Sequence, residues 1–209
     1  MNDRKSVPFA NVVHRIFEGP WGYRYIRGAF HFGVRKEPIR KVLELKDGDR
    51  VLDVGSGTGD YSMIVDSDRY TYLGVDLDQI YVNQATKDYG RPFRQFKVLD
   101  IRDMSFPSKS FDKAMCMGVL HHLNDEDALV MLKHVSRIIT DRLVISDLGP
   151  GGWHVVNNLL CRYDRGQYPR KLADQVKLVG QVMDVVSARH YYVRSGVQRY
   201  SLLVAKPRS

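Results

Sequence analysis

The stretch Val51-Leu52-Asp53-Val54-Gly55-Ser56-Gly57-Thr58-Gly59-Asp60 decides the fold of this chain. Its first residues suit a buried strand, three glycines follow at alternate positions, and residues 61–65 continue as a short helical pattern. Glycine lets the backbone turn tightly and lets a ligand approach main-chain N–H groups without a Cβ in the way. The stretch therefore predicts a strand, a ligand-binding loop and a helix in succession.

The residue after the last glycine, Asp60, restricts what the loop binds. A dinucleotide fingerprint has glycine there, and a P-loop has Gly-Lys-Ser/Thr. A carboxylate at the start of a helix opposes a pyrophosphate, because that end of a helix otherwise favours anions. We therefore expect a ligand that is neutral or positive where it touches the loop. This expectation disfavours a nicotinamide-dependent oxidoreductase.

A second acidic residue, Asp76, ends the next strand pattern and lies 23 residues after Asp53. An acidic residue about 20 positions beyond such a loop commonly accepts the two hydroxyl protons of a ribose. The alternative is a tight turn followed by an ordinary strand-end aspartate. The loop, Asp60 and Asp76 together favour a nucleoside site.

At these positions the sequence resembles a class I S-adenosylmethionine-dependent methyltransferase of the small single-domain, methyltransferase-11-like type. The segments that match the family's motifs lie within about residues 40–148 and follow one another in the family's order. They are residues 51–59, Gly74-Val75-Asp76, Leu99-Asp100-Ile101, and Phe111-Asp112 through Leu120-His121-His122-Leu123. The resemblance implies an enzyme that transfers a methyl group, with S-adenosyl-L-methionine as cofactor.

Strand-like and helix-like runs alternate from residue 50 onward, which indicates βαβ units and a parallel sheet. Strands are expected near 50–54, 71–75, 95–98, 111–116 and 141–147, and helices near 60–66, 78–88 and 125–139. Residues 182–193 and 197–205 read as two strands joined at Ser195-Gly196. The family resemblance implies a Rossmann-like, doubly wound α/β sheet of seven strands, mostly parallel, with a C-terminal antiparallel hairpin. Helical cap elements are expected over the strand ends.

The length of 209 residues is best interpreted as one domain with elaborations. We divide it into an N-terminal extension (1–44), a cofactor-binding core (45–148), a cap or substrate segment (149–180) and the hairpin (181–209). The apolar and charged fractions, 44% and 27%, are ordinary for a globular protein. We expect a cytoplasmic enzyme with no metal site, since the two cysteines have no metal-ligand spacing and no apolar run suits a membrane span or secretory signal.

The resemblance assigns cofactor contacts to matching positions. The glycine loop would line the methionine moiety and the ribose, Asp76 would bind the ribose hydroxyls, and Asp100 would accept from the adenine amino group. For Leu77, Ile101 and Met117 the alternative is core packing. The full set is Asp53, Gly55, Ser56, Gly57, Gly59, Asp76, Leu77, Asp100, Ile101, Met117 and Gly118.

Three histidines are candidates for a catalytic base, because an imidazole titrates near neutrality. His121 and His122 follow the fourth strand, near the expected position of the transferred methyl group, and His154 opens the presumed cap. Adjacent residues on a turn or helix point about 100° apart, so one of the pair is expected to face the site and the other to pack or cap locally.

Basic residues concentrate in the two regions that flank the core. Residues 1–44 carry nine Lys/Arg against four Asp/Glu and residues 150–209 carry ten against three, whereas residues 45–149 carry 13 against 17. The pattern suggests an anionic acceptor, although a solvated basic surface would look the same. Arginine matches phosphate or carboxylate oxygens, so the candidate substrate residues are Arg24, Arg27, His31, Tyr163, Arg165, Tyr168 and Arg170.

The sequence thus predicts methyl transfer to a small-molecule, sugar-linked or lipid-linked anionic acceptor, with O-methylation favoured slightly over N-methylation. Two alternatives stay open. Interleaved aromatic and basic residues in 9–36 are compatible with an RNA acceptor. The second alternative is a non-catalytic subunit that keeps a nucleoside pocket, although the intact loop and Asp76 argue against it.

Overall fold

The computed structural model describes residues 36–100, 102–103, 105–151, 157–158, 167–192 and 198–208. Its helices and strands follow the alternation that the sequence predicts. In chain order they are α3 (Lys36–Leu43), β1 (Arg50–Val54), the 3₁₀ helix η1 (Asp60–Val65), β2 (Thr71–Asp76), α4 (Gln79–Tyr89), β3 (Arg94–Val98), β4 (Phe111–Met117), the 3₁₀ helix η2 (Leu120–His122), α5 (Asp125–Ile138), β5 (Ile139–Leu148), α7 (Leu172–Val179), β6 (Met183–Tyr192) and β7 (Arg199–Pro207).

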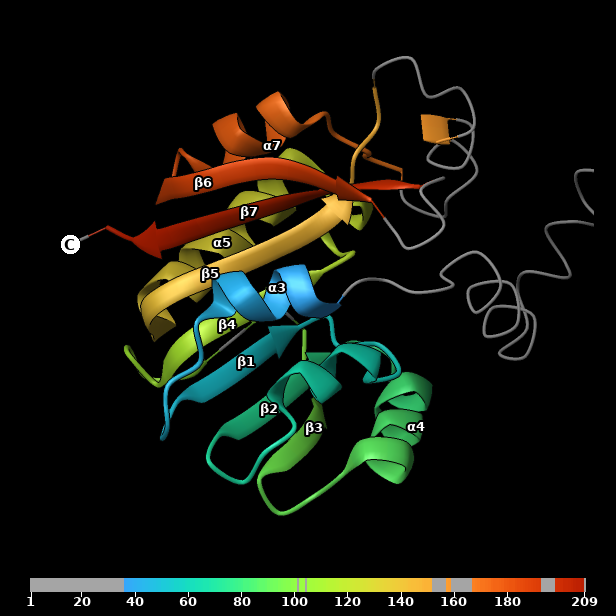
Figure 1. Cartoon of the computed structure of the whole chain (residues 1–209), viewed down its shortest axis with the longest axis vertical. Coiled ribbons are helices and arrows are strands. Elements are labelled where there is room, and N and C mark those ends of the chain that lie inside the picture. Colours follow the sequence, from blue (N-terminus) through green and yellow to red (C-terminus); the bar gives the residue numbers. More distant parts are fainter. Residues whose placement is uncertain are drawn as a thin grey trace, which may run out of the picture.

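The described strands form one seven-stranded sheet in the order β3-β2-β1-β4-β5-β7-β6. Strand β1 pairs in parallel with β2 and β4, and β3 and β5 extend the parallel part on either side. Strand β7 is antiparallel to both β5 and β6. In Figure 1 the arrowheads of β1 and β5 point the same way and that of β7 points the opposite way. The predicted doubly wound sheet with a C-terminal antiparallel hairpin is therefore confirmed.

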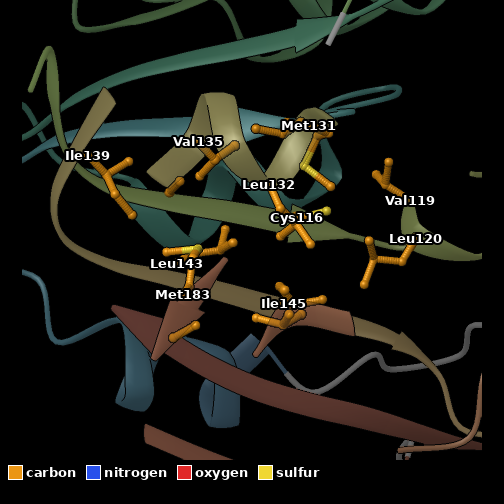
Figure 2. Close-up of a cluster of buried hydrophobic side chains, with 14 of the residues drawn as sticks. Cys116, Val119, Leu120, Met131, Leu132, Val135, Ile139, Leu143, Ile145 and Met183 are labelled. Carbon is orange, nitrogen blue, oxygen red and sulfur yellow. The ribbon is translucent and has the colours of Figure 1, made fainter. Parts of the chain in front are cut away.

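Side chains of successive strand residues alternate between two apolar cores. On β4, Ala114 and Cys116 belong to the core beneath α5 and α7, whereas Met115 and Met117 belong to the core beneath α3, η1 and α4. Figure 2 shows the first of these cores, where Cys116 of the sheet lies among side chains of α5. Both faces are covered, so β4 and β5 are buried along most of their length.

The element boundaries agree with the sequence to within about two residues. Helix α5 begins as expected at Asn124, whose side chain accepts a hydrogen bond from the backbone N–H of Asp127 at 2.8 Å. Strand β5 begins at Ile139, two residues earlier than predicted, because it follows α5 with no intervening loop. The helix after the glycine loop is a 3₁₀ helix that ends at Val65.

Parts of the two predicted cap regions pack on the faces of the sheet. Helix α3 buries Ile39 and Leu43 in one core, and α7 buries Leu178 and Val179 in the other. Most of residues 1–44 and several residues of 149–180 lie outside the described residues, so the cap over the strand ends stays a prediction. Among the described helices, none combines the length and apolar content that crossing a bilayer requires.

Candidate active site

The glycine loop after β1 has three glycines in the left-handed region, with φ of +72° at Gly55, +52° at Gly57 and +82° at Gly59. A Cβ on Gly55 would lie 2.4 Å from a methyl group of Val119, and one on Gly59 would lie 3.0 Å from Ala85. A Cβ on Gly57 would meet no protein atom within 4 Å. Two of the glycines therefore permit close packing, and Gly57 borders space in which a ligand fits.

The carboxylate of Asp76 lies at the carboxyl end of β2 and is fixed against this loop. The backbone N–H of Gly57 donates to its Oδ2 at 2.8 Å, and the N–H of Asp78 donates to its Oδ1 at 3.0 Å. Each carboxylate oxygen keeps a second lone pair, so Asp76 can still accept from a diol. Beside it, the side chain of Leu77 is 65% exposed. The predicted ribose and adenine contacts therefore border the open space at Gly57.

Asp60 is held at the start of η1 by two hydroxyl groups. The Thr58 hydroxyl donates to one carboxylate oxygen at 2.9 Å and the Tyr89 hydroxyl to the other at 3.0 Å. Its negative charge is therefore fixed at the mouth of the loop. This position suits a positively charged ligand and opposes a diphosphate.

Asp53 is fully buried beneath the loop. The Tyr72 hydroxyl donates to its Oδ2 at 2.6 Å, while its Oδ1 and the hydroxyl of the nearby loop residue Ser56 have no hydrogen-bond partner within the described structure. Burial raises the pKa of Asp53 to about 7, against a smaller opposing effect of the Tyr72 hydrogen bond. Such a carboxyl responds to a cation bound above the loop, which is compatible with the predicted place of Asp53 among the cofactor contacts.

Asp100 follows β3, as predicted, but its carboxylate is engaged within the chain. The Arg102 guanidinium donates to both carboxylate oxygens, with its shortest contact at 2.7 Å, and these bonds lower the pKa of Asp100. An adenine amino group would have to share an acceptor with Arg102. Ile101 lies outside the described residues.

Met117 and Gly118 end β4 on the same edge of the sheet. The Met117 side chain is buried in the core beneath α3. Gly118 has φ of +71°, and its N–H donates to the Ser146 carbonyl of β5 at 2.7 Å. The chain turns at Gly118 and runs directly into η2, which carries two of the candidate bases.

The two adjacent histidines of η2 differ sharply in environment. His121 is 6% exposed, and its Nδ1 lies 2.5 Å from Asp147 Oδ1. His122 is exposed, and its ring centroid lies 4.1 Å from that of His121. His154 lies outside the described residues. Sequence reasoning did not single out Asp147. A carboxylate in the apolar C-terminal part of β5 was the available indication that this residue has a buried partner.

Of the predicted substrate residues, Arg170 and Tyr168 are described, and both contact η2. The Arg170 guanidinium donates to the carbonyls of Leu120 and Leu123, each at 2.7 Å, and to Asp125. The Tyr168 backbone N–H donates to the His121 carbonyl at 2.9 Å. A substrate role is untested for either residue. Outside the described residues lie Arg24, Arg27, His31, Tyr163 and Arg165.

A groove of about 740 Å³ opens between α7 and β6, beyond the end of β5. Its apolar lining comes from Pro150, Gly151, Leu172, Ala173, Val176 and Ala188, and its basic lining from Lys171, Lys177, His190 and Arg199. The Arg199 guanidinium donates to the carbonyls of residues 149–151 and so shapes the groove. Burial and the neighbouring Arg199 lower the pKa of His190. Within the described part of the chain, neither lysine forms an ion pair.

The sheet order, the glycine loop and the acidic strand ends together define a nucleoside-binding α/β domain. The family model described as "Methyltransferase domain" matches residues 51–142, which run from β1 into β5. This segment, somewhat less than half of the chain, is similar to a methyltransferase domain, which agrees with the resemblance to class I S-adenosylmethionine-dependent methyltransferases and with S-adenosyl-L-methionine as the cofactor that this resemblance implies. Among the described residues no group of three or more histidine, cysteine or acidic side chains is arranged to hold a metal ion.

Curated relatives match this chain over part of their length. An uncharacterized protein of Methanocaldococcus jannaschii is 27% identical over 78% of this chain and 60% of its own length. A fatty-acid O-methyltransferase of Mycolicibacterium smegmatis is 32% identical over 61% of this chain and 43% of its own length. The chain therefore covers about half of the length of these two relatives.

A solved structure agrees in fold over nearly the whole chain. The magnesium protoporphyrin IX methyltransferase of Synechocystis, crystallised with bound S-adenosylhomocysteine, superposes with a TM-score of 0.69 at 19% identity. The match covers 94% of this chain and 98% of that protein. At this identity the similarity establishes the shared fold.

Proposed function

We propose that this chain transfers a methyl group from S-adenosylmethionine to a small, anionic acceptor that carries an apolar part, as a lipid-linked or sugar-linked acceptor does, with oxygen favoured over nitrogen. When bound, the cofactor supplies an activated methyl group on a sulfonium. The residues would hold it as the family pattern implies: the loop from Gly55 to Gly59 against the methionine end, and Asp76 on the ribose. The open space at Gly57 supports this placement.

Our proposal about the acceptor rests on the residues that line the groove between α7 and β6. It combines an apolar floor with the ammonium groups of Lys171 and Lys177, which matches an anion with an apolar body. Its wall at Pro150 is four residues beyond Ser146, whose carbonyl binds Gly118. That length of chain spans at most about 14 Å, so a molecule of lipid or nucleotide size can occupy the groove and reach the cofactor site.

The remaining task of the protein is to position the two reactants. Methyl transfer is an in-line displacement, so the protein must align the acceptor atom with the methyl carbon and exclude water. Helix η2 and the loop after β4 lie at the carboxyl ends of the parallel strands, where ligands of open α/β sheets bind. The name of the Mycolicibacterium relative, a fatty-acid O-methyltransferase, also supports an apolar acceptor.

The test incubates the protein and methyl-labelled S-adenosylmethionine with separate lipid, small-metabolite and RNA fractions of a cell extract. Label in the lipid or small-metabolite fraction supports the proposal, and label in RNA alone supports the RNA alternative. A protein that binds S-adenosylhomocysteine but labels no fraction fits the non-catalytic alternative. Gly57→Val is the negative control, since its side chain fills the cofactor space.

The groove is tested with the double variant Lys171→Glu/Lys177→Glu against the labelled acceptor. Charge-assisted contacts are each worth about 1.5 kcal/mol or more, so KM for the acceptor should rise at least about tenfold. Lys87→Glu, an exposed lysine at the end of α4, is the matched control. An unchanged KM in the double variant would place the acceptor elsewhere.

A further inference from the structure

The buried pair of His121 and Asp147 joins two elements that end at the cofactor site. Besides the 2.5 Å contact at Nδ1, the His121 backbone N–H donates to the other oxygen of Asp147 at 3.2 Å. The backbone N–H of Leu148 donates to Oδ1 at 2.6 Å. Asp147 is 1% exposed and its carboxylate takes part in three hydrogen bonds, so its position is well defined.

A ring of hydrogen bonds holds both members of the pair in place. The Ser201 hydroxyl of β7 donates to the Asp147 carbonyl at 3.1 Å and contacts the Gln175 side chain at 2.6 Å. Gln175 of α7 donates to the carbonyls of Leu148 and Arg170. Arg170 in turn binds the carbonyls at both ends of η2. Residues far apart in the sequence therefore hold the backbone on both sides of the pair.

The edge of the His121 ring lies beside Gly118. Its Cε1 is 3.7 Å from the position that a Cβ on Gly118 would take. Gly118 is the residue that the family pattern places beside the methionine of the cofactor. The imidazole thus borders the region where the acceptor atom must approach the methyl carbon.

We propose that His121 is the general base that deprotonates the methyl acceptor and that Asp147 is its positioning residue. The inference rests on the proposed function and narrows it to acceptors that must lose a proton, a hydroxyl or an amine. With the Nδ1 proton directed to Asp147, the lone pair of the neutral ring is on Nε2. An acceptor carboxylate, already ionised near neutrality, would need no such base.

The step balances without a further reactant. The acceptor's lone pair forms the bond to the methyl carbon as the carbon–sulfur bond breaks, and the bonding electrons go to sulfur. The acceptor's proton passes to Nε2 of His121. The imidazolium that results is stabilised by the carboxylate of Asp147, and it returns the proton to water after the product leaves.

Two titratable groups beside the pair, Cys116 and Tyr191, keep their protons near neutral pH. Burial, and after it the charges of Asp147 and Asp53, raise the pKa of the Cys116 thiol on β4. Burial also raises the pKa of Tyr191 on β6 to about 12, and Asp147 adds to this. The remaining neighbours are His122, stacked on the ring, and the Arg170 guanidinium beneath η2. The exposed His122 is therefore the histidine to control for.

The test measures label transfer from S-adenosylmethionine into the small-metabolite and lipid fractions across pH 5.5–9. The proteins compared are the wild type, His121→Gln, Asp147→Asn, His122→Gln and, as control, His134→Gln. Loss of a general base typically costs 10²- to 10⁴-fold, so we expect kcat to fall at least about 100-fold in His121→Gln and substantially in Asp147→Asn. The acidic limb of the rate profile should move to lower pH in Asp147→Asn, because the imidazolium loses its anionic partner. His134→Gln on α5, a control outside η2, should keep the wild-type profile, and a larger loss of rate in His122→Gln than in His121→Gln would overturn the assignment.

Two further measurements separate catalysis from folding. The thermal shift by S-adenosylhomocysteine should be unchanged in every variant, and added imidazole should restore part of the rate to His121→Ala. A wild-type rate in His121→Gln, an unmoved acidic limb in Asp147→Asn, or His121→Ala that binds the cofactor product yet is not rescued would each overturn the inference. Wild-type protein that labels no fraction would instead contradict the proposed function itself.

Discussion

The backbone N–H of Gly57 donates to the carboxylate of Asp76 at 2.8 Å, and this bond joins the glycine loop to the end of the neighbouring strand. The strand end and the loop therefore form one unit around the open space at Gly57. Because both residues are proposed to contact the nucleoside, changes at either should act on ligand binding more than on the fold.

We predict that Gly57→Val abolishes stabilisation by S-adenosylhomocysteine. Ligand at 100 times its dissociation constant should raise the stability of the wild type by about 2.7 kcal/mol, measured as a rise in melting temperature. Gly48→Val is a matched control, since Gly48 also has a positive φ and open space around its Cβ position but lies in the turn before β1. Both variants should lose intrinsic stability, and only Gly57→Val should lose the ligand response.

Leu77→Asp should weaken the binding of S-adenosylhomocysteine about tenfold and leave the stability of the free protein nearly unchanged. The Leu77 side chain is 65% exposed, so the fold does not depend on it, whereas an adenine ring packed against it would lose about 1–2 kcal/mol of apolar contact. Val186→Asp, at a 58% exposed position on β6, is the control. Equal affinities, measured by calorimetry, would show that adenine binds away from Leu77.

The buried carboxyl of Asp53 should make the free protein less stable as the pH rises from about 4 to 7. Its pKa in the folded state is about 7, above the ordinary value of 3.8, so in this range the unfolded chain ionises while the folded chain stays protonated. The pKa of Asp53 is about three units higher in the folded state than in the unfolded chain. Above pH 7 this difference lowers the free energy of unfolding by an amount on the order of 4 kcal/mol. Asp53→Asn should remove this dependence.

Denaturant unfolding at pH 2, 3, 4.5, 6 and 8 measures the free energy of unfolding, and the prediction is checked as the difference between wild type and variant. The partly exposed Asp112 should show the opposite sign, because the Arg50 guanidinium lowers its pKa to about 2. Its stabilisation is therefore present above pH 4 and is lost as the pH falls through 2. A wild-type-minus-variant difference for Asp53→Asn that does not vary with pH would contradict the role of burial.

Arg170→Met should destabilise the protein by about 2–3 kcal/mol, because two backbone carbonyls of η2 lose charged donors. Arg170→Lys should recover little of this, since one ammonium cannot reproduce the planar fork. Arg69→Met, which removes an exposed ion pair with Asp47, should cost less than about 1 kcal/mol. If Arg170→Met is as stable as the wild type, the structural role of Arg170 is contradicted. Only its predicted role in binding substrate would then remain.

The fold was largely predictable because its main determinants are local in the sequence. The apolar run before Gly55, the cap at Asn124 and the alternation of strands and helices each lie within a few residues of the element they specify. The cofactor loop was predictable for the same reason. Its contact with Asp76 spans only one βαβ unit.

The pair of His121 and Asp147 was less accessible to sequence reasoning. The two residues lie 26 positions apart, and their contact depends on how β4 and β5 pair. Their neighbour Gln175 is buried on a helix that the sequence placed in a cap segment. Arg170 was predicted to contact substrate because a guanidinium suits an anion. In the structure it binds Asp125 and two backbone carbonyls, which only the folded chain brings together.

The insertion of β7 between β5 and β6 has a consequence for biosynthesis. The ribosome makes residues 199–207 after every other strand, yet these residues occupy an interior place in the sheet and supply Ser201 to the backbone of Asp147. A nascent chain can form its glycine loop early. The hydrogen bond from Ser201 to the backbone of Asp147, the partner of His121, forms only when this last strand inserts between β5 and β6.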